Sequence, residues 1–192
     1  MTYLVAGLLI FLGVHSVRIF ADGWRTQTLQ RLGEGVYKSI YTLLALTGLC
    51  LIIYGFGLAR EMPVMLWTPP MGMRHAATLF TVVAFVLLAA AYVPRNGIKA
   101  RVHHPMVLGV KSWALGHLLA TGSVAHLLLF GSFLAWGVLN YIAARRRDRL
   151  AGTQYPAGTL GGTAITVVVG VAAWAVFAFK LHGLLIGIRP FG

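Results

Sequence analysis

The sequence predicts an all-α integral membrane protein whose single domain, residues 1–192, is a bundle of six transmembrane helices. Of the 192 residues, 58% are hydrophobic and only 10% are charged, whereas a soluble domain carries about 25% charged residues. The mean hydropathy is +0.80, and the apolar residues gather into stretches of about 20, the length that crosses a bilayer. This composition excludes an ordinary soluble domain and intrinsic disorder.

Six segments are apolar enough to be membrane-spanning helices. The fourth and fifth share one apolar stretch, Pro105–Ala144, which as a single helix would be about 60 Å long, twice the thickness of a bilayer core. We therefore expect a helical hairpin at Thr121-Gly122-Ser123. The other four spans are expected at Tyr3–Phe20, Val36–Leu58, Arg74–Val93 and Leu160–Leu185.

The basic residues predict the orientation of these spans. The loops at 21–35, 94–104 and 144–159, with the adjoining helix ends, carry 12 of the 16 Lys and Arg residues. Basic residues collect on the cytoplasmic side, so both termini are expected to face away from the cytoplasm. The run Arg145–Arg149 is interpreted as a segment that contacts anionic lipid headgroups, and no nucleic-acid partner is expected. The start of the chain lacks a basic segment and a cleavage site, so we expect a retained first span.

The single cysteine, Cys50, excludes several cofactors. One thiol within a chain cannot form a disulfide framework or hold a zinc finger or an iron–sulfur cluster. Covalent c-type haem is excluded as well, because the chain has no C-x-x-C-H motif.

Two histidines are predicted to lie deep in the membrane. His15 in the first span and His117 in the fourth are each about 12 residues, roughly 18 Å, from one end of their span. Imidazoles from two helices at one depth can hold a haem iron from both sides. Three interpretations of the pair stay open: haem ligation, interhelical hydrogen bonds, and a zinc or copper site.

Neighbouring residues fit a cofactor at the same depth. Arg18 and Lys111 lie toward the cytoplasmic side of the two histidines and can either pair with haem propionates or extend to the lipid headgroups. Trp113, one turn before His117, can pack on a cofactor or simply within the core. His126, near the outer end of the fifth span, is expected to be a reserve ligand or a donor to a substrate.

Three stretches of the sequence, in the first span, the first loop and the fourth span, resemble motifs of the NnrU family. The stretch His104–Gly122, with the pattern H-P-x5-K-x-W-x3-H, resembles the signature of that family. Leu12–Arg18 resembles its opening motif, and Arg31-Leu32-Gly33-Glu34 followed by Tyr37-Lys38 resembles its first loop. The resemblance covers nearly the whole chain and implies a multi-pass protein of the bacterial inner membrane.

The resemblance also implies a cofactor. NnrU proteins are associated with denitrification, that is, with nitrite and nitric oxide reduction, and the related 15-cis-zeta-carotene isomerases bind haem b. The axial histidines of those isomerases match His15 and His117, so haem b is the cofactor that the resemblance implies. The chain departs from the isomerases at Ala114, where they carry a cysteine, and at Lys111, where Gln is common.

Two kinds of function are therefore expected, and the sequence does not choose between them. One is redox-linked or isomerase-like chemistry on a lipophilic substrate or nitric oxide. The other is a non-catalytic accessory, sensor or electron-transfer role that supports nitrite or nitric oxide reduction. Besides membrane lipid, the expected partners are a second copy of the chain or a respiratory protein.

Overall fold

The computed structural model describes residues 1–191, and this part of the chain is helical without strands. It divides into two compact units. The first comprises residues 1–70 and 121–144, and the second comprises residues 71–120 and those from 145 on. The helix α6, Val124–Ala151, begins in the first unit and ends in the second.

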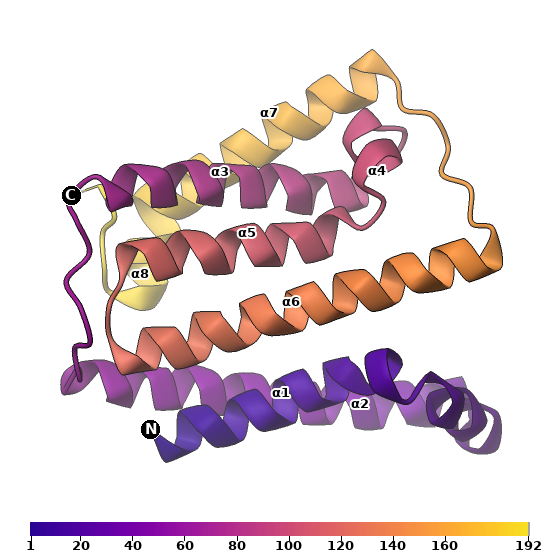
Figure 1. Ribbon diagram of the computed structural model, residues 1–192, viewed down its shortest axis with the longest axis horizontal. Helices are drawn as coiled ribbons and strands as arrows, with labels where there is room; N and C mark the ends of the chain where they lie inside the picture. The colour runs from indigo at the N-terminus through magenta and orange to yellow at the C-terminus, as the bar shows by residue number, and fades with distance from the viewer. Residues whose placement is uncertain (192) are drawn as a thin grey trace. The chain divides into compact units, whose positions relative to one another are not determined.

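In the first unit, α1 (Thr2–Phe20) lies along α2 (Asp22–Glu61), as Figure 1 shows. Glycines allow this close packing. A Cβ added at Gly48 of α2 would lie 2.7 Å from the backbone nitrogen of Phe11, and one at Gly7 of α1 would lie 2.6 Å from that of Ile52. Because real Cβ atoms do not approach backbone this closely, the two helices depend on small residues at their contact.

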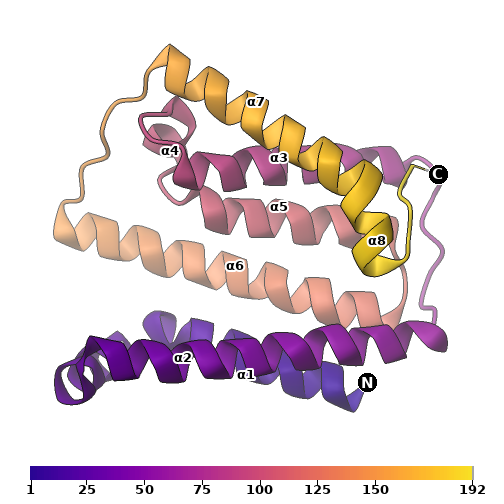
Figure 2. The same ribbon diagram turned by 180° about the vertical axis from the view of Figure 1, so that it is seen from behind.

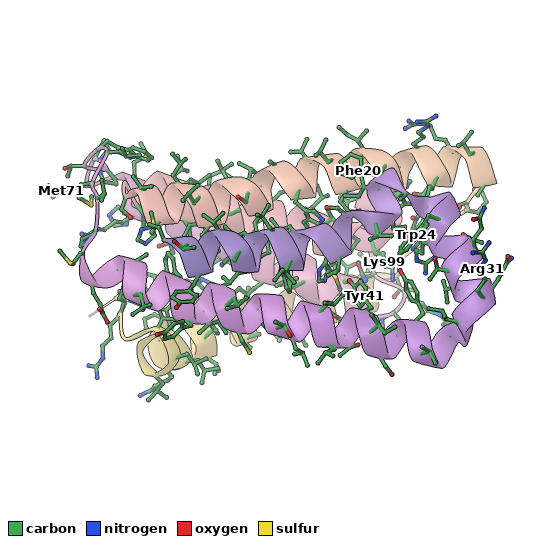
Figure 3. The ribbon with its side chains drawn as sticks, turned by 90° about the horizontal axis from the view of Figure 1, so that it is seen from below. Phe20, Trp24, Arg31, Tyr41, Met71 and Lys99 are labelled. Atoms are coloured by element: carbon green, nitrogen blue, oxygen red, sulfur yellow. The ribbon has the colours of Figure 1, made fainter. Side chains whose placement is uncertain are left out.

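The predicted loop at 21–35 is largely helical. The helix α2 begins at Asp22 and is interrupted at Gly33, whose φ of 78° and ψ of 160° lie outside the helical region. Figure 3 shows Trp24 and Arg31 on the part of α2 before this break. Glycine adopts such a positive φ without strain, so Gly33 separates a polar first segment from the apolar span that follows.

The second unit contains α3 (Met73–Tyr92), α4 (Gly97–Val102), α5 (Pro105–Ala120) and the C-terminal helix. That last helix comprises α7 (Leu160–Val176), a π-helical turn η1 (Phe177–Leu181) and α8 (His182–Ile186). Both α5 and α7 pack on α3, and Figure 2 shows α3 between them. Gly116 of α5 lies against Phe80, and Trp174 of α7 donates a hydrogen bond from Nε1 to the Thr81 hydroxyl at 3.1 Å.

The predicted loop at 94–104 contains the short helix α4. Asn96, 2% exposed, begins this helix because its side-chain oxygen accepts a hydrogen bond from the Lys99 N–H at 2.7 Å. Its amide nitrogen donates to the carbonyls of Ala90 and Val93 at the end of α3. One buried side chain therefore fixes the corner between the two helices.

The predicted break at Thr121-Gly122-Ser123 is confirmed, because α5 ends at Ala120 and α6 begins at Val124. Five of the described helices are long and apolar enough to cross a membrane: Thr2–Phe20, Asp22–Glu61, Met73–Tyr92, Val124–Ala151 and Leu160–Ile186. The predicted fourth span, α5, has only 16 residues. Large apolar side chains such as Leu160 and Leu184 are 92% and 80% exposed, as suits helices that contact membrane lipid.

Candidate functional site

His15 lies on α1 in the first unit. Its Nδ1 is 2.6 Å from the carbonyl oxygen of Phe11, one helical turn earlier. A carbonyl only accepts hydrogen bonds, so Nδ1 carries the proton and donates it. In the neutral imidazole, Nε2 is then the unprotonated nitrogen, the form in which histidine binds a metal.

Three aromatic rings surround the His15 imidazole. Phe11 stacks on it at a centroid distance of 4.2 Å and an interplanar angle of 29°. Tyr41 of α2, labelled in Figure 3, lies at 5.3 Å, and Trp136 of α6 lies at 6.2 Å with its plane nearly perpendicular, at 86°. The imidazole therefore sits among rings from three helices, an apolar setting that holds its orientation.

The indole of Trp136 has a polar atom without a partner. Its Nε1 is buried and finds no hydrogen-bond acceptor within residues 1–191. Buried N–H groups nearly always have an acceptor. The Trp136 N–H lies beside His15, where the sequence predicts a cofactor.

Arg18 is on α1, as predicted, and it has a carboxylate close by. Its Nε lies 3.8 Å from Asp22 Oδ1, and its side chain is 60% exposed. Arg25 lies 3.9 Å from the same oxygen. Any role of Arg18 toward a propionate would therefore compete with Asp22.

His117 is on α5 in the second unit. Its Nδ1 lies 2.8 Å from the carbonyl oxygen of Trp113, again one turn earlier, and the two rings lie at 5.3 Å. By the argument used for His15, Nδ1 donates and Nε2 is the unprotonated nitrogen. The two predicted ligands thus have the same local geometry, although they belong to different units.

The contacts of α5 with α3 fix the position of His117. The Ser112 hydroxyl donates to the Phe80 carbonyl at 2.6 Å, and Gly116 would place a Cβ only 2.9 Å from the Phe80 Cβ. Ala114, where the isomerases carry cysteine, is fully buried. Lys111 and Trp113 are half-buried on the same helix. Of the predicted site residues, Lys111, Trp113 and His117 therefore share one unit, and His15 and Arg18 share the other.

The reserve ligand His126 is held at the start of α6. Its Nδ1 lies 2.6 Å from the Ser123 hydroxyl, and its ring meets Phe56 edge-on at 5.1 Å. The Arg60 guanidinium lies 5.2 Å from the centre of the same Phe56 ring. A hydroxyl both donates and accepts, so this contact does not fix the tautomer of His126.

Sequence reasoning missed a polar cluster in the second unit, beyond the apolar part of α6. Asp148 Oδ2 lies 2.8 Å from His104 Nε2, 2.9 Å from the Tyr155 hydroxyl and 3.3 Å from an Arg145 nitrogen. Burial alone would raise the pKa of Asp148, but the hydrogen bonds from Tyr155 and His104 and the charge of Arg145 outweigh it and lower that pKa. The cluster also includes His103, which stacks on Tyr155 at 4.2 Å and bonds to Arg145.

Only some of the contacts around these side chains could be predicted from the sequence. Phe11 is four residues before His15, so helical spacing alone places the two together. Nothing in the sequence connects Tyr41 or Trp136 with His15, because their contacts depend on how α1, α2 and α6 pack. The pairing of Asp148 with His104 spans 44 residues and is likewise a result of folding.

The described residues contain no group of three or more His, Cys, Asp or Glu side chains that could hold a metal ion. Haem needs fewer protein ligands than a bare ion, because the porphyrin supplies four nitrogens and the protein supplies the axial ones.

The fold is that of a multi-pass helical membrane protein, and two half-buried histidines are anchored on its helices. The family model described as NnrU protein matches residues 3–190, nearly the whole chain. The chain therefore belongs to the NnrU family. No curated protein and no solved structure matches it.

Proposed function

We propose that this NnrU-family protein is a haem b protein of the bacterial inner membrane, with His15 and His117 as the axial ligands. The observation that carries the proposal is the shared anchoring of the two imidazoles. Each donates Nδ1–H to the carbonyl four residues earlier, at 2.6 Å and 2.8 Å. That bond fixes the ring and leaves Nε2 as the ligand atom, which is the usual arrangement of metal-binding histidine.

The residues around His15 fit a porphyrin. Phe11, Tyr41 and Trp136 supply flat apolar surface, and the unpaired Trp136 N–H supplies a donor. Haem b would contribute one-electron redox chemistry or a Lewis-acidic iron. The protein's part would be to bind the ring, keep water away from it and hold the proton on Nδ1 of each histidine.

The topology is part of the proposal. We take α5 as a sixth crossing, because its 16 residues span about 24 Å and its two ends adjoin the short connections at 103–104 and 121–123. The basic loops would then face the cytoplasm and both termini the opposite side. In this arrangement His15 and His117 lie at similar depth.

The function we favour is redox-linked chemistry on a lipophilic substrate or nitric oxide. His15 and His117 would hold the haem, and the haem would supply the redox chemistry once one histidine makes way for the substrate. The isomerase thiol cannot take part here, because Ala114 stands in its place. Two permanent histidine ligands would close the iron to substrates. In that case the protein would be the electron carrier or accessory of nitrite or nitric oxide reduction.

Spectra of purified variants test the proposal. His15→Ala and His117→Ala are each expected to lose the low-spin b-type spectrum while keeping the helical circular dichroism. His75→Ala is the matched control, since His75 is an exposed histidine at the start of α3. Full haem in both His15 and His117 variants would refute the ligand assignment. A spectral shift when nitric oxide meets the reduced protein would favour a displaceable ligand, and no shift would favour electron transfer.

A further inference from the structure

Trp136 carries a hydrogen-bond donor that the described chain does not use. Its indole Nε1 is buried and has no acceptor in residues 1–191. Water is absent from the bilayer core, and a buried donor without a partner costs about 1–3 kcal/mol. An acceptor supplied by a bound group would remove that cost.

The position of Trp136 beside His15 is set by two contacts between α6 and α1. Trp136 meets the His15 ring at 6.2 Å. Phe133, one turn earlier on α6, meets Phe11 at 5.7 Å, and Phe11 is the residue whose carbonyl anchors His15. Because both contacts belong to the first unit, the donor and the proposed ligand are held together by the same packing.

The surroundings of His15 limit what the acceptor can be. His15 Nδ1 donates to the Phe11 carbonyl and therefore does not accept, and His15 Nε2 is the nitrogen proposed to bind the iron. A porphyrin whose four nitrogens bind iron offers strong acceptors only at its propionate carboxylates. An N–H donor to a carboxylate forms a charge-assisted hydrogen bond, about twice as strong as a neutral one.

We propose that the Trp136 Nε1–H donates a hydrogen bond to a propionate of haem held by His15. This inference rests on the proposed function and assigns a specific contact within it. Trp136 is then a cofactor-binding residue that secures the edge of the ring, while His15 binds the iron. The alternative acceptor is an oxygen of a lipid or of a lipophilic substrate, and the experiment separates the two.

Haem titrations of the full-length protein in detergent test this assignment. The wild type, Trp136→Phe and the control Trp174→Phe are each titrated with haem b and with its dimethyl ester, which lacks the carboxylate charges. Phenylalanine keeps an aromatic ring at position 136 and removes the donor. Trp174 is a suitable control because its N–H already bonds to Thr81 in the second unit.

Trp136→Phe is expected to bind haem at least about tenfold more weakly than the wild type, the effect of one charge-assisted hydrogen bond. Trp174→Phe should bind like the wild type. With the dimethyl ester, the difference between the wild type and Trp136→Phe should largely disappear, and the wild type itself should bind the ester more weakly than haem.

Other results would overturn the assignment. Equal haem affinity of the wild type and Trp136→Phe would exclude the hydrogen bond and leave haem ligation intact. If Trp136→Phe lowered the affinity for haem b and for the ester equally, the indole would act by packing and not as a hydrogen-bond donor. Equal affinities of the wild type for haem b and for its dimethyl ester would show that the propionate is not the acceptor. If the wild type bound no haem, the proposed function would fail first, and the assignment with it.

Discussion

Replacing Gly48 with alanine should disturb both the helix pair of the first unit and the histidine that it positions. A Cβ at Gly48 would lie 2.7 Å from the backbone nitrogen of Phe11 and 3.0 Å from its Cα. These atoms belong to a helix backbone and cannot rotate away. The helices would have to separate by several tenths of an ångström to restore ordinary contact, which begins at 3.4 Å.

Overpacking of this kind costs about 1–3 kcal/mol. Gly57, on the same helix, provides a matched control, because a Cβ there meets nothing within 4 Å. Both substitutions gain the same helix propensity, about 1 kcal/mol, so the difference between the variants isolates the cost of the contact. Gly48→Ala should therefore be less stable than Gly57→Ala by about 1–3 kcal/mol.

Reversible unfolding in mixed detergent micelles, followed by circular dichroism, measures this difference. Haem affinity provides a second readout, since Gly48 contacts the residue that stacks on His15 and anchors it. We expect Gly48→Ala to weaken haem binding and Gly57→Ala to leave it unchanged. Equal stability of the two variants would refute the close packing of α1 on α2.

Three further perturbations test the second unit. Asn96→Ala should destabilise the protein by about 1–3 kcal/mol, because it removes the cap of α4 and leaves two carbonyls without a donor; a melting curve like that of the wild type would contradict this role. Thr81 and Trp174 share a hydrogen bond, so the effects of Thr81→Val and Trp174→Phe on the free energy of unfolding should be coupled by about 0.5–1.5 kcal/mol in a double-mutant cycle. Additive effects on that free energy would show that the bond contributes nothing. The lowered pKa of Asp148 means that its contribution to stability is present above the ordinary carboxyl pKa, about 4, and is lost as the pH falls through the lowered value. Asp148→Asn should therefore be less stable at neutral pH by about 1–2 kcal/mol and should show a flatter decline in acid; parallel curves for the two proteins would contradict this.

Hydropathy was a good guide to the apolar helices and a poor one to the polar connections. The spans near Tyr3–Phe20 and Arg74–Val93 agree closely with α1 and α3, because about 20 consecutive apolar residues leave few alternatives to a helix. The short helix α4 was missed, since its stability depends on the contacts of Asn96 with the end of α3. Those contacts form only when the chain is folded.

The helix boundary at 121–123 was predicted from length alone, and the structure supplies its local cause. Gly122 accepts hydrogen bonds from the Leu66 and Trp67 N–H groups through its carbonyl, and Ser123 is 3% exposed. The backbone comes so close here that a side chain at position 122 would clash with Trp67. Glycine is therefore required by packing, which hydropathy does not register.

The two candidate ligands were found by depth and spacing, and their anchoring follows from helix geometry. A histidine in a helix can donate to the carbonyl four residues earlier, so the bonds to Phe11 and Trp113 are local. The partners Tyr41 and Trp136 are set by tertiary packing and had no signal in the sequence. Only the structure shows the long-range contacts at the site and the Trp136 N–H that lacks an acceptor within residues 1–191.

The most direct test of the central claim is the optical spectrum of the purified wild-type protein, recorded oxidised and after reduction with dithionite. The protein should be expressed with ample haem supply and kept in a mild detergent. Sharp low-spin b-type bands in the reduced state are expected if His15 and His117 bind the iron. A colourless protein would contradict haem binding, and the two anchored histidines would then be residues of helix packing.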